Sequence, residues 1–156
     1  YGEYWAGVGR GVNSLVQFTL GTGIGCGVVI NGKILEGEHS HGAESGHIRI
    51  ALDHPRYNAT GLYGSLEAYA SAKAIIERAQ EAMATGERSS LESILSRGEE
   101  LTAKEIFDAA AAGDALSERI VEQTAFYLAV GAVNLMHVID PNVVVFSGGM
   151  IAAGQS

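Results

Sequence analysis

The alternation of apolar and polar positions divides the chain into a β-rich first third and a largely helical remainder. Between residues 14 and 52, apolar side chains alternate with polar ones or form short runs, as in the strands of a half-buried sheet. Asn31 and Gly32 separate two of these runs and favour a hairpin turn, because both central positions of that turn need a positive φ. The pattern predicts strands over residues 15–20, 24–30, 33–35 and 47–52.

From residue 65 onward the apolar residues recur at helical spacing. The first helix is expected to run from its N-cap to Met83 and to stop at Gly86. A much longer helix near the end of the chain has an almost wholly apolar second half, residues 125–136, which we expect to be buried on most sides. Small polar residues, two of them followed by glutamate in a capping box, predict four N-caps: Ser65, Ser89, Thr102 and Asp114.

A short continuous apolar run, residues 143–146, precedes Ser147, Gly148 and Gly149. A run of this length that ends in a glycine turn is typical of a fully buried strand. With the hairpin, the helices and this last strand in one chain, the sequence predicts a single α/β domain. The first residues, from Tyr1 to Trp5, have the pattern of a helix already under way, so we expect the chain to be a segment of a longer protein.

Composition narrows the class of protein. Of the 156 residues, 47% are hydrophobic and 18% are charged, as in ordinary water-soluble domains. The net charge of −8 argues against a surface that binds the phosphates of nucleic acid or of a membrane, so neither is an expected partner. Cys26 is the single cysteine, which excludes an intramolecular disulfide and fits a cytoplasmic location. No apolar run approaches the ~20 residues of a membrane-spanning helix.

A glycine-rich run between the first two expected strands is a candidate phosphate site. Gly21 and Gly23 lack a Cβ, so backbone N–H groups can approach an anion closely and form a concave nest, and Thr22 adds a hydroxyl donor. The run is not a P-loop, because no Gly-Lys-Ser/Thr sequence and no helix follow it. A glycine-rich hairpin with close contacts between its strands explains the run equally well.

The order of four motifs is more specific than any one of them. The motifs are the glycine run at residues 20–27, the turn at 30–33, the sequence Glu44-Ser45-Gly46-His47 and the helix start at 65–72. In this order they resemble the ROK family (repressors, open reading frames, kinases), which includes bacterial glucokinases, fructokinases and N-acetylmannosamine kinases. The resemblance covers residues 1–156. It implies the α/β fold of actin-like, ribonuclease-H-like ATPases, with this chain as part of the second, C-terminal domain.

The resemblance also implies roles for nine residues. They are Gly21, Thr22 and Gly23 for the ATP phosphates, Glu44, His47 and Glu67 for the sugar hydroxyls, and Ser147, Gly148 and Gly149 for the adenosine side. Carboxylates suit sugar recognition, because they accept hydrogen bonds from vicinal hydroxyls. Each residue also has an ordinary explanation: Glu67, for example, is favoured by the helix dipole in the first turn of any helix.

Members of the family commonly hold zinc with a histidine and three cysteines, and this chain departs from that pattern. The three cysteine positions fall on Asn58, Thr60 and Ser65. None of these is a thiolate ligand and only His47 remains, so we expect no zinc. The loop of residues 53–64 must then be held by other means, such as packing of Tyr57 against Tyr63. Solvated loop histidines are favoured over a replacement metal site at His39, His41, His47 and His54.

The resemblance implies an ATP-dependent hexose kinase, with glucokinase as the leading candidate, that transfers a phosphoryl group from Mg²⁺-bound ATP to a hydroxyl of a hexose or amino-hexose. The family's catalytic base is an aspartate a few residues upstream of the position that matches Tyr1. No catalytic residue is therefore expected in this chain, and the segment alone is expected to be inactive. The family commonly forms homodimers, and the late apolar helix is a candidate contributor.

Two other functions stay open. Transcriptional repressors of the same family keep a sugar-sensing domain and add a DNA-binding head, and the Glu-x-Gly-His motif does not separate them from kinases. The glycine loop around Thr22 and the turn at Ser147 favour the use of ATP. A purely structural or sugar-binding module is the least favoured alternative.

Overall fold

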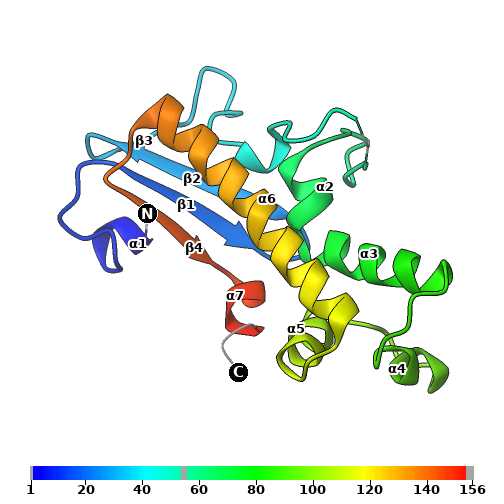
Figure 1. The fold of residues 1–156 in the computed structure, drawn as a ribbon. Coiled ribbons are helices and arrows are strands. Elements are labelled where there is room, and N and C mark those ends of the chain that lie inside the picture. Colours follow the sequence, from blue (N-terminus) through cyan, green and yellow to red (C-terminus); the bar gives the residue numbers. More distant parts are fainter. Residues whose placement is uncertain (1, 54–55, 154–156) are drawn as a thin grey trace.

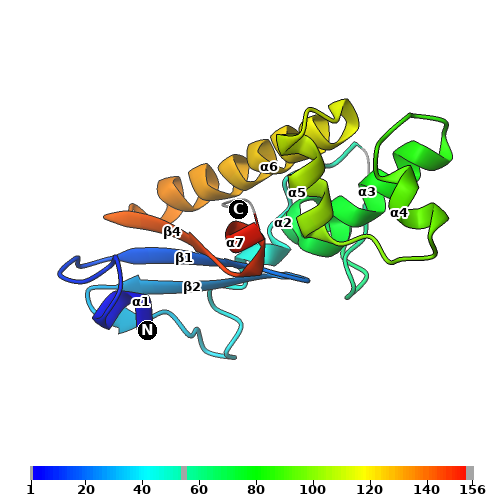
Figure 2. The ribbon, with the colours of Figure 1, turned by 90° about the horizontal axis from the view of Figure 1, so that it is seen from below.

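The computed structural model describes residues 2–53 and 56–153. A four-stranded sheet lies at the centre of one mixed α/β domain, with the strand order β3-β2-β1-β4. Figures 1 and 2 show helix α6 along one face of this sheet, with helices α3, α4 and α5 beyond one end of the strands. The strands are β1 (Leu15–Leu20), β2 (Ile24–Ile30), β3 (Lys33–Ile34) and β4 (Val143–Ser147).

Most of the helices lie in the second half of the chain. The helical elements of the described residues are α1 (Gly2–Trp5), the 3₁₀ turn η1 (Ser45–His47), α2 (Leu66–Ala70), α3 (Ala72–Ala84), α4 (Glu92–Ser96), α5 (Ala103–Ala111), α6 (Ala115–Ile139) and α7 (Gly149–Ala153). The core lies between the sheet and these helices, because the inward side chains of β1 pack against them. Its fully buried members include Val16, Phe18, Leu20, Leu66, Ile75, Ile106 and Ile120.

The helical pattern at the start of the chain is confirmed from Gly2 to Trp5, where α1 forms one turn. Tyr1, the first residue of that pattern, lies outside the described residues.

The strand register places two loops at the same end of the sheet. β1 and β2 form an antiparallel pair in which Leu20 lies opposite Ile24, so residues 21–23 form the connecting turn. β4 runs parallel to β1 with Ser147 opposite Thr19, so the turn after β4 emerges beside that loop. At the other end, the Oδ1 of Asn142 accepts hydrogen bonds from two backbone N–H groups just before β1 and fixes this register.

The turn between β2 and β3 confirms the expected hairpin. Asn31 and Gly32 have φ values of 50° and 75°, as the two-residue turn with two left-handed positions requires. The third strand is shorter than expected, because pairing ends at Ile34.

Two expectations for the strands are wrong. The last strand, β4, is half-buried along its length and not fully buried, because it is the edge strand of the described sheet. Phe146 stacks on Phe18 with ring centroids 5.2 Å apart, so one face of β4 does join the core. Residues 47–52 form no regular strand: Arg49 makes a single bridge to Ser65, and the N–H of Ile50 donates to the carbonyl of Gly64.

Ser65, Thr102 and Asp114 cap helices as expected. The helix predicted from residue 65 to Met83 is instead two helices, because Ser71 is extended (ψ 162°) and its Oγ accepts the N–H of Ala74 as a second N-cap. The helix predicted at Ser89 begins later, because its N-cap is Leu91. Ser89 still donates its N–H to the carboxylate of Glu92, and its Oγ accepts the N–H of Leu91.

Helix α6 is less buried than its composition predicts. In its second half only Gly131 and Leu135 are buried, whereas Phe126 is 65% exposed and Val138 is 81% exposed. The sheet covers one side of the helix, and no other described part of the chain covers the opposite side. Among the described helices, none combines the length and the apolar character needed to cross a membrane.

Candidate functional site

The glycine loop is a tight turn and not a nest. The N–H of Gly21 donates to the carbonyl of Gly23 at 3.0 Å, and Thr22 between them is exposed. A nest needs a residue with positive φ, and neither loop glycine has one, so the expected concave form is wrong for this conformation. A Cβ on Gly21 would meet no atom within 4 Å, so the backbone on that side is open to an approaching group.

Glu67 holds the loop from the first turn of α2. Its Oε2 accepts the N–H of Ile24 at 2.9 Å, at the point where the loop joins β2. A Cβ on Gly23 would overlap the same oxygen, so glycine is required there for Glu67 to reach the backbone. The N–H of Ala72 at the start of α3 donates to the carbonyl of Gly21 at 2.9 Å. The loop is therefore fixed on one side by the starts of both helices.

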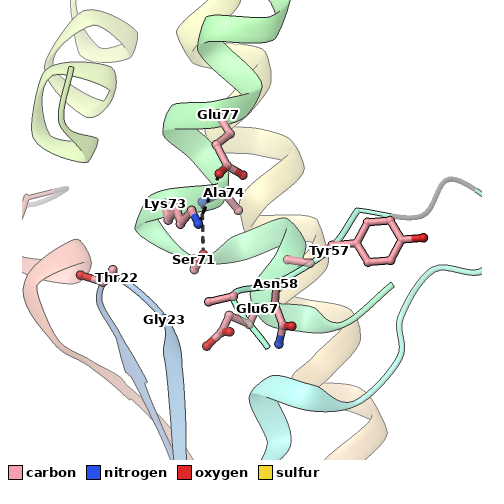
Figure 3. A pocket seen from close by; sticks show the side chains of 11 residues that line it. Thr22, Gly23, Tyr57, Asn58, Glu67, Ser71, Lys73, Ala74 and Glu77 are labelled. Atoms are coloured by element: carbon pink, nitrogen blue, oxygen red, sulfur yellow. Dashed lines mark hydrogen bonds and ion pairs between the residues drawn. The ribbon is translucent and has the colours of Figure 1, made fainter. Parts of the chain in front are cut away.

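A cavity of about 130 Å³ opens where the loop meets these two helices (Figure 3). It brings together Thr22, Gly23 and Glu67, three of the residues that the sequence singled out. The Nζ of Lys73 lies on its wall, 3.7 Å from the carboxylate of Glu77. The full lining is Thr22, Gly23, Tyr57, Asn58, Ala59, Glu67, Ala68, Ser71, Lys73, Ala74 and Glu77.

Sequence reasoning did not find several of these lining residues. Ser71 and Lys73 enter the cavity because the helix breaks at Ser71, which turns the start of α3 toward the loop. No local pattern indicated that break. Asn58 had a recognisable signal, since Asn-x-Thr-Gly is a turn-forming sequence in which the asparagine side chain bonds the backbone two residues on.

The Glu44-to-His47 motif lies against the start of β2. A Cβ on Gly46 would overlap the carbonyl oxygen of Ile24, so η1 packs directly on the residue whose N–H Glu67 binds. His47 is half-buried, and its Nδ1 lies 3.0 Å from the Nδ2 of Asn58. Glu44 is exposed and caps η1 without a side-chain hydrogen bond. Neither Glu44 nor His47 lines the cavity, and Asn58 connects His47 to it.

The turn after β4 lies beside the glycine loop and outside the cavity. The Oγ of Ser147 accepts a hydrogen bond from the Nε2 of Gln17 at 3.0 Å and donates to the carbonyl of Phe18 at 3.3 Å. Gly148 has φ +104°, and a Cβ there would overlap the carbonyl of Leu20. Gly149 starts α7 with open space beside it. The glycines thus let this turn reach the residue that precedes the loop.

The residues present do not fit the zinc site of the family. Asn58, Thr60 and Ser65 offer no thiolate, and Ser65 is buried with its Oγ accepting the N–H of Ala68. Within residues 2–53 and 56–153, no group of three or more histidine, cysteine, aspartate or glutamate side chains is placed to hold a metal ion. His39 and His41 are exposed.

Two expectations concern positions that the structure does not describe. The catalytic base is expected upstream of Tyr1, and Tyr1 itself lies outside the described residues. That such a base lies close to the cavity therefore stays a prediction. The expectation that His54 is a solvated loop histidine also lies outside the described residues.

Aromatic packing and an ion pair hold the loop of residues 56–64. Tyr57 and Tyr63 form a bridge and their ring centroids lie 6.2 Å apart, which confirms the expected packing. Arg56 also binds Glu81 of α3 through two contacts of 2.7 and 3.0 Å. This hydrogen-bonded ion pair raises the pKa of Arg56 and lowers the pKa of Glu81.

Comparison with known sequences and structures identifies relatives of two kinds. Curated glucokinases of Halalkalibacterium halodurans and Thermotoga maritima are 37% and 38% identical over 99% of this chain, which spans 47% and 48% of their lengths. The crystal structure of a ROK family glucokinase from Streptomyces griseus, in complex with glucose and AMPPNP, matches with a TM-score of 0.79 at 30% identity and covers 99% of this chain and 53% of its own.

Regulators are also among the relatives. A ROK family transcriptional regulator, a homologue of the Escherichia coli MLC protein, matches with a TM-score of 0.81 at 28% identity over 99% of this chain and 37% of its own. The xylose repressor of Bacillus subtilis is 26% identical over 97% of this chain. The chain spans about half the length of the curated glucokinases it matches.

The solved relatives carry the actin-like ATPase fold expected from the sequence, and the mixed α/β domain described above superimposes on them over nearly its whole length. The family model of the ROK proteins matches residues 1–156. The chain therefore belongs to the ROK family.

Proposed function

We propose that this chain forms half of an ATP-dependent hexose kinase, with glucokinase as the leading activity. The observation that carries the proposal is the cavity in which Thr22 and Gly23 face Glu67. A hydroxyl and an open glycine backbone suit a phosphate, and a carboxylate suits a sugar hydroxyl. Both are found within one space of about 130 Å³. The identity of 37–38% to two glucokinases supports the same activity.

Each group of residues has one role in the proposal. The phosphates of Mg²⁺-bound ATP lie over Gly21, Thr22 and Gly23, where the two glycines have no Cβ to keep them from the backbone. The adenosine lies toward the turn formed by Ser147, Gly148 and Gly149, which packs against the residue before the loop. Sugar hydroxyls bind Glu44, His47 and Glu67. Binding of both substrates by rigid elements orients the hydroxyl for in-line transfer.

The proton acceptor is proposed to lie outside this chain, upstream of Tyr1. Two carboxylates line the cavity, those of Glu67 and Glu77. Glu67 is engaged with the N–H of Ile24, and Glu77 lies 3.7 Å from both Lys73 and Arg56. Carboxylates whose oxygens already contact donors and cations are poorly placed to take up a proton from a substrate. An aspartate on the facing domain would remove the proton of the attacking hydroxyl.

A homodimer and a cytoplasmic setting belong to the same proposal. One face of α6 exposes the large apolar side chains of Phe126 and Val133, which are seven residues apart, and this suits a second copy of the chain. Cys26 is the one cysteine of the chain, so it can form no intramolecular disulfide, which suits a reducing compartment such as the cytoplasm.

A repressor is the second candidate, favoured by the TM-score of 0.81 to a transcriptional regulator of the family. In that case the same residues would sense a sugar, and DNA would bind to a separate domain. The acidic segment described here would not touch the DNA, given its net charge of −8.

A phosphotransfer assay on the full-length protein separates the candidates. With ATP, Mg²⁺ and each of glucose, fructose, mannose and N-acetylmannosamine, a kinase releases ADP in proportion to sugar phosphate formed. The segment alone is expected to release none. If no sugar elicits ADP release from the full-length protein, the kinase proposal is wrong, and sugar-dependent binding to operator DNA would support the repressor.

A further inference from the structure

The side chain of Asn58 makes four hydrogen bonds that join a loop to His47. Its Oδ1 accepts from the N–H of Thr60 at 3.1 Å, from the hydroxyl of Thr60 at 2.8 Å and from the N–H of Leu62 at 2.9 Å. Its Nδ2 lies 3.0 Å from the Nδ1 of His47. One amide thus closes the turn of residues 58–62 and contacts a predicted sugar-binding residue.

The loop contacts determine which way the amide of Asn58 faces. Two of its partners are backbone N–H groups, which can only donate, so the oxygen must point toward Thr60 and Leu62. The amide nitrogen then faces His47, and an NH₂ group can only donate. The Nδ1 of His47 must therefore accept, and the proton of the neutral imidazole is on Nε2.

We propose that Asn58 is a positioning residue that holds His47 in the Nε2–H tautomer and so replaces the metal ion that a cysteine at its position would bind. Asn58, Thr60 and Ser65 stand at the three cysteine positions, and each has a hydrogen bond in place of a metal bond. The amide orders the turn and orients the imidazole, which are the two tasks of a structural metal at this place.

The consequence for recognition rests on the proposed function as a sugar-binding site. With Nδ1 occupied, His47 presents only a donor, the Nε2–H, to a ligand. A sugar hydroxyl would donate to a carboxylate such as Glu44 or Glu67 and accept from His47. The carboxylate then accepts the hydrogen of a sugar hydroxyl, and His47 donates to a hydroxyl oxygen. In the other neutral tautomer, a lone pair on Nε2 of His47 would face that hydroxyl oxygen.

The variant Asn58→Asp tests the proposal. The aspartate keeps an oxygen for Thr60 and Leu62, so the turn is retained, but it has no donor for His47. The imidazole must then carry a proton on Nδ1, either as the other tautomer or as imidazolium. Two-bond ¹H–¹⁵N spectra of the ¹⁵N-labelled full-length protein, at about pH 8 where an ordinary histidine is neutral, distinguish these forms. His47→Gln assigns the signal.

The expected result is the Nε2–H pattern in the unmodified protein and a protonated Nδ1 in Asn58→Asp. The matched control is Thr60→Val, which removes one hydrogen bond to Oδ1 and leaves the contact with His47 in place. It should keep the Nε2–H pattern. An Nδ1–H pattern in the unmodified protein, or an unchanged pattern in Asn58→Asp, would overturn the proposal, as would stoichiometric zinc bound through His47.

Sugar binding gives a second, separable measurement. Where Asn58→Asp leaves His47 as the neutral Nδ1–H tautomer, the Kd for glucose should rise about tenfold, while the Kd for an ATP analogue changes less than about twofold; tenfold corresponds to about 1.4 kcal/mol. An imidazolium keeps the Nε2–H donor and should leave the Kd for glucose nearly unchanged. If the unmodified protein binds no sugar, the proposed function fails, yet the spectra still test the tautomer. If sugar binds equally well to both proteins while the tautomer changes, the role of Asn58 in recognition is wrong.

Discussion

At the scale of single residues, Glu67 connects the two halves of the proposed site. One of its oxygens holds the N–H of Ile24, where the glycine loop enters β2. A carboxylate has about four acceptor sites, so the same group can also accept from a sugar hydroxyl. Any ligand that draws Glu67 away would release the loop that is proposed to face the phosphates. In the proposed site, sugar binding and loop geometry are thereby linked through one side chain.

The substitution Gly23→Ala should break this link. The added Cβ would overlap the Oε2 of Glu67, so the carboxylate must move away from Ile24. Loss of one hydrogen bond with strain in the loop is expected to lower the free energy of unfolding by about 1–2 kcal/mol. If the full-length protein is the proposed kinase, its KM for ATP should also rise. Urea unfolding and steady-state kinetics measure the two effects.

Gly27→Ala is the matched control for that prediction. Gly27 lies in the strand that follows the loop, and a Cβ there would meet nothing within 4 Å. It should change the unfolding free energy by less than about 0.5 kcal/mol. Equal losses in both variants would mean that the effect comes from strand flexibility and not from Glu67.

At the scale of elements, Asp114 joins the start of α6 to the segment before α4. Its carboxylate accepts the N–H of Ser117, as an N-cap does, and also the N–H of Ser90 at 2.7 Å. The hydroxyl of Ser89 donates to it as well. Partial burial acts to raise the pKa of Asp114, but these hydrogen bonds outweigh it and lower the pKa to about 2.

The pH dependence of stability follows from that shift. A folded-state pKa of about 2, below the ordinary 3.8, means that Asp114 stabilises the fold fully above pH 3.8 and loses this effect as the pH falls toward 2. Because the carboxylate is only partly buried and solvent still screens it, we expect only about 1 kcal/mol from it. Asp114→Asn should lower stability at neutral pH by that amount and flatten the acid limb of the stability curve.

Urea unfolding at a series of pH values measures this effect. Asp108→Asn is the control, because Asp108 is a half-exposed helical acid whose partner, Lys104, lies one turn away. If both variants show the same acid limb, Asp114 has no special part in it.

The elements that sequence predicted well are those set by local chemistry. Asn31-Gly32 specified its turn, because both residues tolerate the positive φ that the turn needs. Thr102 and Asp114 specified helix starts, because their side chains bond the backbone of the first helical turn. The helix boundaries that were predicted wrongly are those that tertiary contacts determine. Good helix formers lie on both sides of Ser71, yet the chain breaks there so that α3 can contact the loop at Gly21.

In the candidate site too, the sequence predicted what its motifs specify and missed a contact between loops. The motif order pointed to the glycine loop and Glu67, and the structure places them in one cavity. The contact of Asn58 with His47 spans 11 residues and depends on how two loops fold against each other. The sequence marked position 58 only as a missing cysteine, since a hydrogen bond between loops leaves no periodic pattern.

At the scale of the whole molecule, the outer side of α6 is an apolar surface. Cavities of about 300 and 460 Å³ lie between α6 and α7, and both are lined mainly by apolar side chains. Phe126, Val133, Met136 and Val138 are exposed on the same helix. A monomer rarely exposes so much apolar surface on one helix, so part of it is expected to be covered in the full-length assembly.

If a second copy covers this helix, Val138→Glu should convert a full-length dimer to a monomer. A charge in an apolar interface is strongly unfavourable, because it is desolvated without a partner. Light scattering with size-exclusion chromatography gives the mass. The control is Val8→Glu, at a position that is 70% exposed and far from α6 in the chain, which should leave the mass unchanged. A dimer that survives the Val138 change places the interface elsewhere.

The parallel pairing of β1 with β4 has a consequence for folding during translation. The hydrogen bonds that fix this pairing join residues that are separated by 128 and 129 positions in the chain. β1 can therefore pair with β4 only after almost the entire segment has been synthesised. Closing so long a loop is slow relative to forming the neighbouring hairpin. The glycine loop can form early with that hairpin, whereas the turn at Ser147 joins it only at the end. If this region binds ATP as proposed, ATP or its analogues should therefore protect it from proteases during translation only after residue 147 has left the ribosome.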